Sequence, residues 1–166
     1  SCSLIWSTDG RHVASGSRRN GAAVLDVSNG KQVILSSYPS EAGEYVAWIK
    51  FHDRNCLVTA SHRIKIWDVD NQELIEEMIY SGDTTFTSIA ASSDGRFCAY
   101  RDKNRISFLD ATSWNCQLEI RSNRPNRKGG VIAFNPVKPL IATPGNDDHS
   151  IDVWRYNAEV LTYRSP

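Results

Sequence analysis

The sequence contains no apolar run that approaches the roughly 20 residues a membrane-spanning helix requires. It also lacks an excess of charge, because 19 basic residues stand against 19 acidic ones. Any binding to nucleic acid or to a membrane surface would therefore depend on uneven placement of charges along the chain. Hydrophobic residues make up 40% of the sequence and charged residues 23%, which is typical of a folded globular protein rather than a disordered one.

Cysteine is scarce, with four residues at Cys2, Cys56, Cys98 and Cys116, and no two of them form a C-x-x-C pair. Their wide spacing gives no zinc pattern, so we predict no metal site. Cys56 and Cys98 lie in apolar stretches, which indicates small buried thiols in a reducing compartment. We therefore expect an intracellular protein, in the cytoplasm or the nucleus.

The most informative stretch comprises residues 63–69, which alternate apolar and polar side chains and end with Trp67, Asp68 and Val69. This alternation is typical of a half-buried strand. Similar short stretches surround Leu25 and Leu109, which lie 42 residues before and after Trp67, and a fourth ends at Trp154. A fixed period of this length indicates a repeat architecture.

Each repeat predicts four short strands that form an antiparallel meander. Asp9-Gly10, Asn29-Gly30 and Asp94-Gly95 separate apolar runs, and such pairs favour tight turns because they tolerate positive φ. Residues 73–79 alone would also suit a short helix, but their position in the repeat favours a strand. The predicted strands are 3–6, 13–17, 22–27 and 33–35; 46–51, 56–60, 63–69 and 73–79; 87–91, 97–101, 105–110 and 116–121; and 130–134, 140–143, 150–156 and 159–163.

Four strands per repeat, with Trp-Asp closing the third, resemble the WD40 family of β-propellers. The best-matching pieces are residues 64–68, 93–96 and 147–154. The resemblance implies an all-β fold: a single propeller segment over residues 1–166, with four blades near 1–38, 39–81, 82–123 and 124–166. It assigns structural blade positions to Trp67, Asp68, Trp154, Asp148, Leu25 and Leu109.

The sequence departs from the family pattern in several ways. The Gly-His pair that often precedes the first strand is missing, and the family's turn aspartate remains only as Asp148, with Ser61 in its place in the second repeat. The hydrogen-bonded network of the family can therefore be at most partial, and we expect stability to depend on apolar packing between blades. Residues 6–11 also resemble bacterial TolB-type propellers, although Trp67-Asp68 favours WD40.

No catalytic or cofactor site is predicted. Asp147, Asp148, His149 and Ser150 place carboxylates, an imidazole and a hydroxyl in one turn. Catalysis requires such groups to converge on one point, whereas successive side chains of a tight turn point in different directions. We therefore expect a non-enzymatic protein without a cofactor.

Basic residues gather in the turns between second and third strands and in the connections between blades, which share one face of a propeller. Acidic residues share this face, so an ordinary solvated surface is the competing interpretation. Trp114 lies in a turn, where a packed and an exposed aromatic are equally compatible with the sequence. The candidate partner-binding residues are Arg18, Arg19, Arg101, Lys103, Arg105, Arg124, Arg127, Lys128 and Trp114.

These features predict a non-catalytic protein–protein interaction scaffold within a larger assembly. Arginine suits carboxylate and phosphate groups, so the expected partner is an acidic or phosphorylated protein. The alternative is a propeller that contacts RNA or DNA phosphate; no membrane binding is expected. Because WD40 rings usually have more than four blades, we also expect the ring to be closed by additional chain or by a second copy.

Overall fold

A computed structural model describes residues 3–17, 21–35, 45–52, 54–78, 86–102, 105–121, 131–144, 150–156 and 161–162. Within these ranges the chain forms β-strands and turns, and it contains no helix. The described part accordingly has no helix with the length and hydrophobicity needed to cross a membrane.

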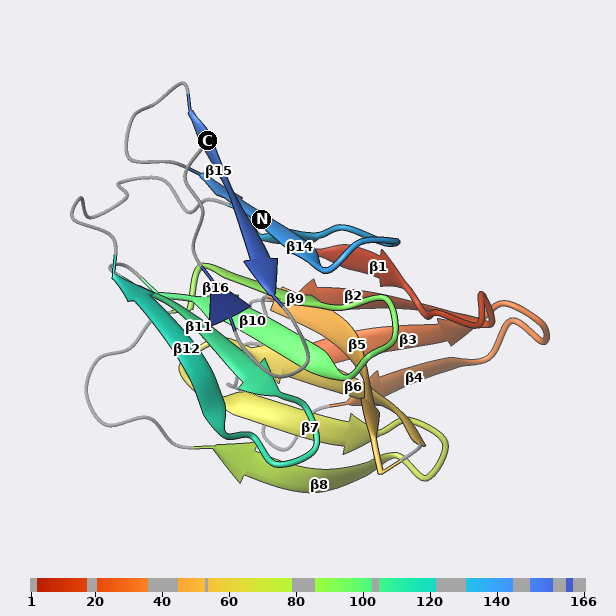
Figure 1. Ribbon diagram of the computed structural model, residues 1–166. Helices are drawn as coiled ribbons and strands as arrows, with labels where there is room; N and C mark the ends of the chain where they lie inside the picture. Colours follow the sequence, from red (N-terminus) through yellow and green to blue (C-terminus); the bar gives the residue numbers. More distant parts are fainter. Residues whose placement is uncertain are drawn as a thin grey trace.

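The strands form four separate sheets, each an antiparallel meander of four consecutive strands (Figure 1). We call these sheets blades 1 to 4. Blade 1 contains β1 (Leu4–Trp6), β2 (His12–Ser17), β3 (Gly21–Asp26) and β4 (Gln32–Leu35). Blade 2 contains β5 (Tyr45–Phe51), β6 (Arg54–Ala60), β7 (Ile64–Asp68) and β8 (Glu73–Met78). Blade 3 contains β9 (Ser88–Ala91), β10 (Phe97–Arg101), β11 (Arg105–Asp110) and β12 (Cys116–Arg121). Blade 4 contains β13 (Ala133–Phe134), β14 (Leu140–Pro144), β15 (Ile151–Tyr156) and β16 (Leu161–Thr162).

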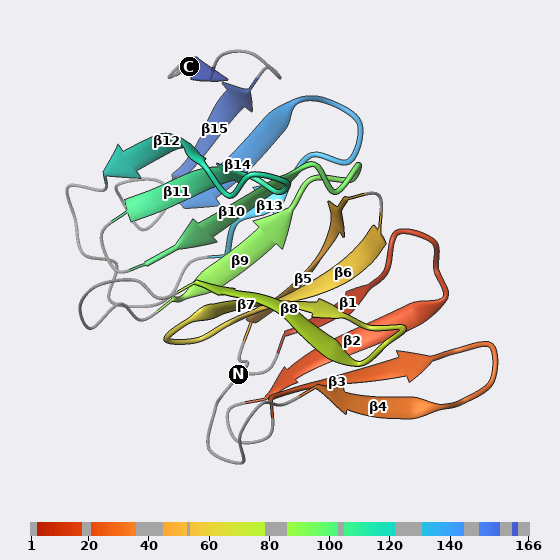
Figure 2. The ribbon, with the colours of Figure 1, turned by 90° about the horizontal axis from the view of Figure 1, so that it is seen from below.

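The blades follow one another in chain order, with blades 1 and 4 at opposite ends of the series in Figure 2. Contacts between blades run through the first strands, from β1 to β5, from β5 to β9 and from β9 to β13. This is the arrangement of a four-bladed β-propeller, which confirms the predicted fold class. Residues 73–78 form the strand β8 rather than a helix, because pairing with β7 overrides the local helix propensity.

Three apolar clusters hold the blades together, one at each junction between successive blades. The first joins Val24 and Leu35 of blade 1 to Trp48 and Trp67 of blade 2. The second packs the Ile64 side of blade 2 against blade 3, and the third packs blade 3 against blade 4. Blades 2 and 3 thus each present one face to the preceding blade and the other to the following blade, because side chains alternate between the two faces of a strand.

The predicted blade positions behave according to their place in this series. Trp67 is only 5% exposed and Leu109 is 2% exposed, whereas Trp154 is partly buried. Leu25 occupies the matching place in blade 1 but is 39% exposed, because none of the described strands packs against that side of blade 1. Asp148 lies outside the described residues.

The structure confirms that the thiols of Cys56 and Cys98 are buried. Neither has accessible surface, and burial raises the pKa of Cys56 to about 11 and that of Cys98 to about 12. Such thiols stay protonated and unreactive at neutral pH. Cys116 is exposed, and Cys2 lies outside the described residues.

The four blades are of two kinds that alternate along the chain and differ in their hydrogen bonds. The 42-residue spacing alone does not reveal this difference. In blades 1 and 3, a serine hydroxyl at the start of the first strand accepts a hydrogen bond from the next blade; Ser3 immediately precedes β1, and Ser88 is the first residue of β9. Ser3 Oγ accepts from the backbone N–H of Val46 at 3.0 Å, and Ser88 Oγ accepts from that of Ile132 at 3.1 Å. Ser3 and Ser88 are 85 residues apart, or about two blades.

Blades 2 and 4 share a different feature, a hydrogen bond between a tryptophan and a threonine of the neighbouring strand. Trp67 Nε1 donates to Thr59 Oγ1 at 3.0 Å, and Trp154 Nε1 donates to Thr143 Oγ1 at 2.9 Å. Leu25 and Leu109 stand at the tryptophan position in blades 1 and 3. The structural repeat is therefore a pair of blades, and the chain contains two such pairs.

Candidate interaction surfaces

The candidate surfaces are two ends and two outer faces of the series of blades. The basic loop face is the end that carries the turns between second and third strands. Its described arginines are paired with carboxylates: Arg63 Nη1 lies 2.7 Å from Glu77 Oε1, and Arg105 contacts Asp102 and Glu119. These ion pairs hold Arg105 in place, and its bond to Asp102 raises the pKa of its guanidinium. The described part of this face is therefore close to charge balance.

Arg101 differs from the prediction that it projects from this face. It is only 3% exposed, and its Nη1 has no hydrogen-bond partner among the described residues. Burial lowers the pKa of this guanidinium, although the nearby Asp102 opposes the effect. The reason is that β10 extends through Arg101, so the side chain belongs to a packed sheet and not to a turn.

The other predicted basic residues of this face lie outside the described residues, so the structure does not bring them together. They are Arg18, Arg19, Lys103, Arg124, Arg127 and Lys128.

Trp114 occupies a backbone position that usually favours glycine. Its φ is +56°, and the matching turn of blade 1 has Gly30 at +72°. The side chain is partly buried against the cluster between blades 2 and 3, and that packing offsets the cost of the left-handed conformation. This placement matches the packed alternative, and contact of Trp114 with a partner stays a prediction.

The opposite end carries turns that are closed by aspartates. Asp68 accepts hydrogen bonds from the backbone N–H and the Nδ2 of Asn71, each at 3.0 Å, and from Arg54 at 3.2 Å. The backbone bond from Asn71 is the main cause that lowers the pKa of Asp68 below its ordinary value of 3.8, against the opposing effect of burial. Asp26 and Asp110 close the corresponding turns of blades 1 and 3. These carboxylates are acceptors that stabilise turns.

Replacing Asp68 with Asn is expected to make the free energy of unfolding less dependent on pH in the acidic range. Since the folded pKa is depressed, the stabilisation is present above the unfolded pKa and is lost as pH falls through the folded value. At pH 7 we expect the variant to lose about 1–3 kcal/mol relative to wild type, and below the folded pKa this difference should vanish. Thermal unfolding of both proteins between neutral pH and acid measures the effect. Asp70→Asn removes an exposed carboxylate from the same turn and serves as the control; an equal effect there would contradict the assignment.

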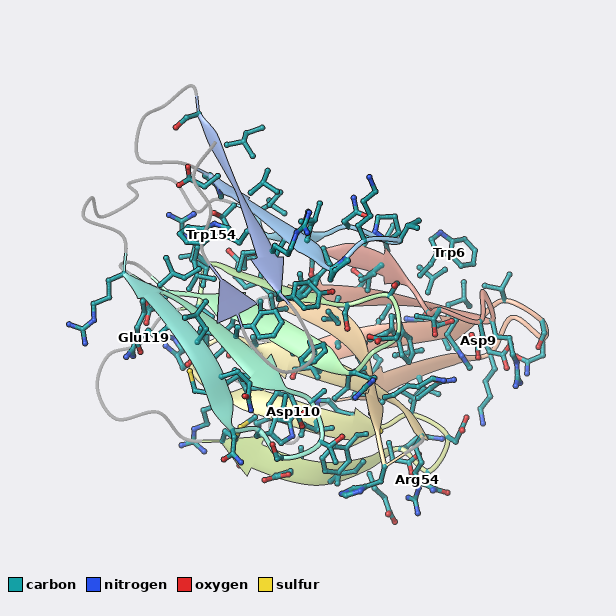
Figure 3. The ribbon with its side chains drawn as sticks, in the orientation of Figure 1. Trp6, Asp9, Arg54, Asp110, Glu119 and Trp154 are labelled. Carbon is teal, nitrogen blue, oxygen red and sulfur yellow. The ribbon has the colours of Figure 1, made fainter. Side chains whose placement is uncertain are left out.

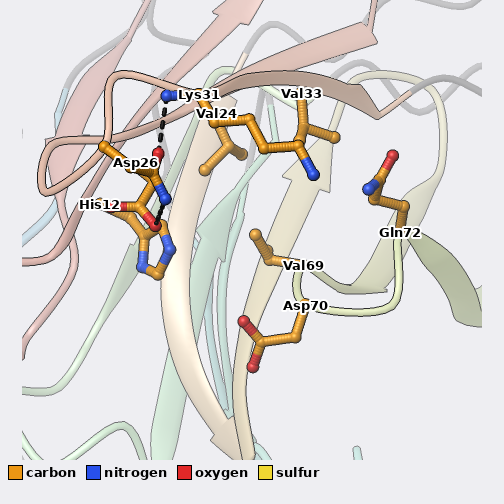
Figure 4. A pocket seen from close by; sticks show the side chains of 9 residues that line it. His12, Val24, Asp26, Lys31, Val33, Val69, Asp70 and Gln72 are labelled. Atoms are coloured by element: carbon orange, nitrogen blue, oxygen red, sulfur yellow. Dashed lines mark hydrogen bonds between the residues drawn. The ribbon is translucent and has the colours of Figure 1, made fainter.

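A pocket of about 170 Å³ lies at this end, between the turns of blades 1 and 2 (Figure 4). Asp26, Lys31 and Asp70 give it polar walls, while Val24, Val33 and Val69 give it an apolar floor. His12 packs beside Trp48, with ring centroids 5.8 Å apart. No hydroxyl or thiol nucleophile lines the pocket, and the described ranges contain no group of three or more potential metal ligands. The pocket therefore offers a small mixed surface with an imidazole, an amine and two carboxylates among its lining residues.

The outer faces of the terminal blades carry most of the exposed apolar surface. The first-blade outer face consists of Leu4, Trp6, Leu25 and Ile34, and the last-blade outer face consists of Val131, Ile151 and Val153. Together they include seven of the eleven large hydrophobic side chains exposed in the described chain. Trp6 lies at the edge of the molecule in Figure 3 and is 57% exposed. Contiguous apolar patches of this kind mark interaction sites.

The fold defines a β-propeller of four blades, and no family model matches the sequence. Sequence reasoning missed Thr59 and Thr143, the hydrogen-bond partners of the two blade tryptophans. The available sequence signal was a single threonine within the mostly apolar second strand of blade 2 and of blade 4. It also missed the composition of the outer faces, because the sequence does not show which apolar strand faces lie at the ends of the series.

Proposed function

We propose that this chain is a WD40-type propeller segment that acts as a non-catalytic scaffold for protein–protein interaction within a larger assembly. The observation that carries the proposal is the concentration of exposed apolar side chains on the two outer faces. A folded chain that leaves a tryptophan and several aliphatic side chains in solvent gains free energy when a partner covers them.

The turn chemistry supports a scaffold rather than an enzyme. Asp9, Asp26 and Asp68 each accept hydrogen bonds within their own turns, and these bonds lower the pKa of each carboxyl. A general acid near neutral pH needs a raised pKa, so these groups suit structure better than proton transfer. The Trp67–Asp68 pair, with its bonds to Thr59 and Asn71, supports the WD40 assignment.

The basic loop face is the second proposed contact surface, for an acidic or phosphorylated protein. Reversing the charge of Arg124 and Arg127 together should leave folding intact and slow association with the partner on the order of tenfold at low salt. A pull-down from cell extract that compares Arg124→Glu/Arg127→Glu with wild type measures the effect. Arg11→Glu/Lys138→Glu reverses two exposed charges at the opposite end and is the matched control.

Recovery of the same proteins by the wild type, by Arg124→Glu/Arg127→Glu and by the control variant would contradict a role for the basic loop face. Loss of nucleic acid instead of protein, with a steep dependence on salt, would favour the alternative in which the loops contact phosphate.

A further inference from the structure

The first-blade outer face has the same design as a face that is buried inside the chain. In blade 1, Trp6 pairs with Val13 and Val13 with Leu25 across adjacent strands. In blade 3, the corresponding row is Ala91, Cys98 and Leu109. Blade 2 covers that row, so Cys98 and Leu109 are buried, whereas Trp6 and Leu25 are open to solvent.

The last-blade outer face corresponds in the same way to the face of blade 2 that covers blade 3. Register places Ile151 and Val153 of β15 where Ile64 and Ile66 lie in β7. Ile64 and Ile66 have no exposed surface, whereas Ile151 is 69% and Val153 is 44% exposed. The same apolar positions are therefore covered at one junction and uncovered at the end of the series.

A matching pair of turns shows the same difference at the level of the backbone. Gly10 and Gly95 occupy equivalent Ser-x-Asp-Gly turns, each with φ of +70°. A Cβ on Gly95 would lie 2.5 Å from the backbone nitrogen of Lys50 in blade 2, whereas Gly10 has nothing within 4 Å. At Gly95, the preceding blade, blade 2, fills the space next to the turn. At Gly10, the corresponding space is open.

We propose that a second copy of this chain covers these faces, with the last-blade outer face of each copy packed on the first-blade outer face of the other. The proposal rests on the proposed scaffold function and names one partner for it. The paired-blade repeat favours this occupant, because blade 4 is of the blade 2 kind and blade 1 is of the blade 3 kind. The contact between copies would thus repeat the junction between blades 2 and 3.

Such a contact joins two different surfaces, and two copies form a closed ring when each uses both. The ring would contain eight blades, within the range of about four to eight that propellers adopt. Arg155 alternates with Ile151 and Val153 along β15 and adds one exposed charge to the last-blade outer face. The side chains that define the first-blade outer face are uncharged, so this charge meets no like charge among them.

Sedimentation velocity from about 1 to about 100 µM tests the proposal, because association depends on protomer concentration. The wild-type chain should sediment as a species of twice 18.6 kDa. Trp6→Glu and Ile151→Glu should each give monomers, since each places a charge in the contact. Val137→Glu alters an exposed apolar residue of the β13–β14 turn and should leave the dimer unchanged.

Mixing Trp6→Glu with Ile151→Lys should restore dimers, because one contact then joins opposite charges and the other is wild type. A dimer that survives Ile151→Glu would overturn the head-to-tail contact, and longer oligomers would overturn the closed ring. A wild-type monomer at about 100 µM would overturn the proposal as a whole. A monomer whose protein partners still depend on Arg124 and Arg127 would leave the scaffold function intact.

Discussion

Replacing Trp67 with Ala should lower the free energy of unfolding by about 3–5 kcal/mol, the usual cost of truncating a buried aromatic side chain. Trp67 is 5% exposed, packs between blades 1 and 2, and donates a hydrogen bond to Thr59. The substitution removes the packing and also leaves the buried threonine hydroxyl without this donor. For a domain of this size, the melting temperature should fall by roughly 6–20 °C.

Trp6→Ala provides the control, because Trp6 is an equally large side chain that lies on an uncovered face. Its removal should change the melting temperature of the monomer by little, since its ring is already largely in solvent. Calorimetry of both variants at low protein concentration measures the contrast. An unchanged melting temperature for Trp67→Ala would show that the blade register is wrong.

Gly95→Ala should have the second largest effect, about 2–5 kcal/mol, from two additive costs. A left-handed backbone costs a non-glycine residue about 1–2 kcal/mol, and forcing an extra atom into a packed site adds about 1–3 kcal/mol. The added Cβ would meet the backbone nitrogen of Lys50 at 2.5 Å, and that same N–H donates to the Gly95 carbonyl at 2.9 Å. The clash cannot be relieved by a side-chain rotation, because the neighbour is backbone.

Gly10→Ala isolates the first of these costs. Its φ is the same, but its surroundings are open, so the loss should be only about 1–2 kcal/mol. Denaturant unfolding of the two variants gives both values. Equal losses would mean that blade 2 does not press on the Gly95 turn.

The strands and their grouping could be predicted from the sequence because the repeat places apolar alternation and Asp-Gly turns at a regular spacing. The strand β8, Glu73–Met78, shows how the repeat corrects local propensity. Burial was harder to predict, because it depends on neighbours from other blades. Leu25 and Leu109 hold the same position, yet only Leu109 has a blade over it.

The candidate surfaces were less predictable for the same reason. Arg101 was expected to project from the basic loop face, although it is the last residue of the predicted strand 97–101; the structure has the same strand and buries the side chain. Trp114 has a left-handed backbone conformation and packs against the cluster between blades 2 and 3. Neither property could be predicted from the sequence of its turn. The pairing of blades rests on contacts such as Ser88 with Ile132, which join residues 44 positions apart. A pattern within one repeat carries no information about such contacts.

Amide hydrogen exchange at Ile132 tests most directly the central claim that each blade packs on the next in a fixed register. Its N–H donates to Ser88 Oγ across the junction between blades 3 and 4, as the N–H of Val46 donates to Ser3 Oγ between blades 1 and 2. In Ser88→Ala, exchange at Ile132 should accelerate on the order of tenfold while Val46 keeps its wild-type rate. Unchanged exchange at Ile132, or equal acceleration at both amides, would contradict this account of the fold.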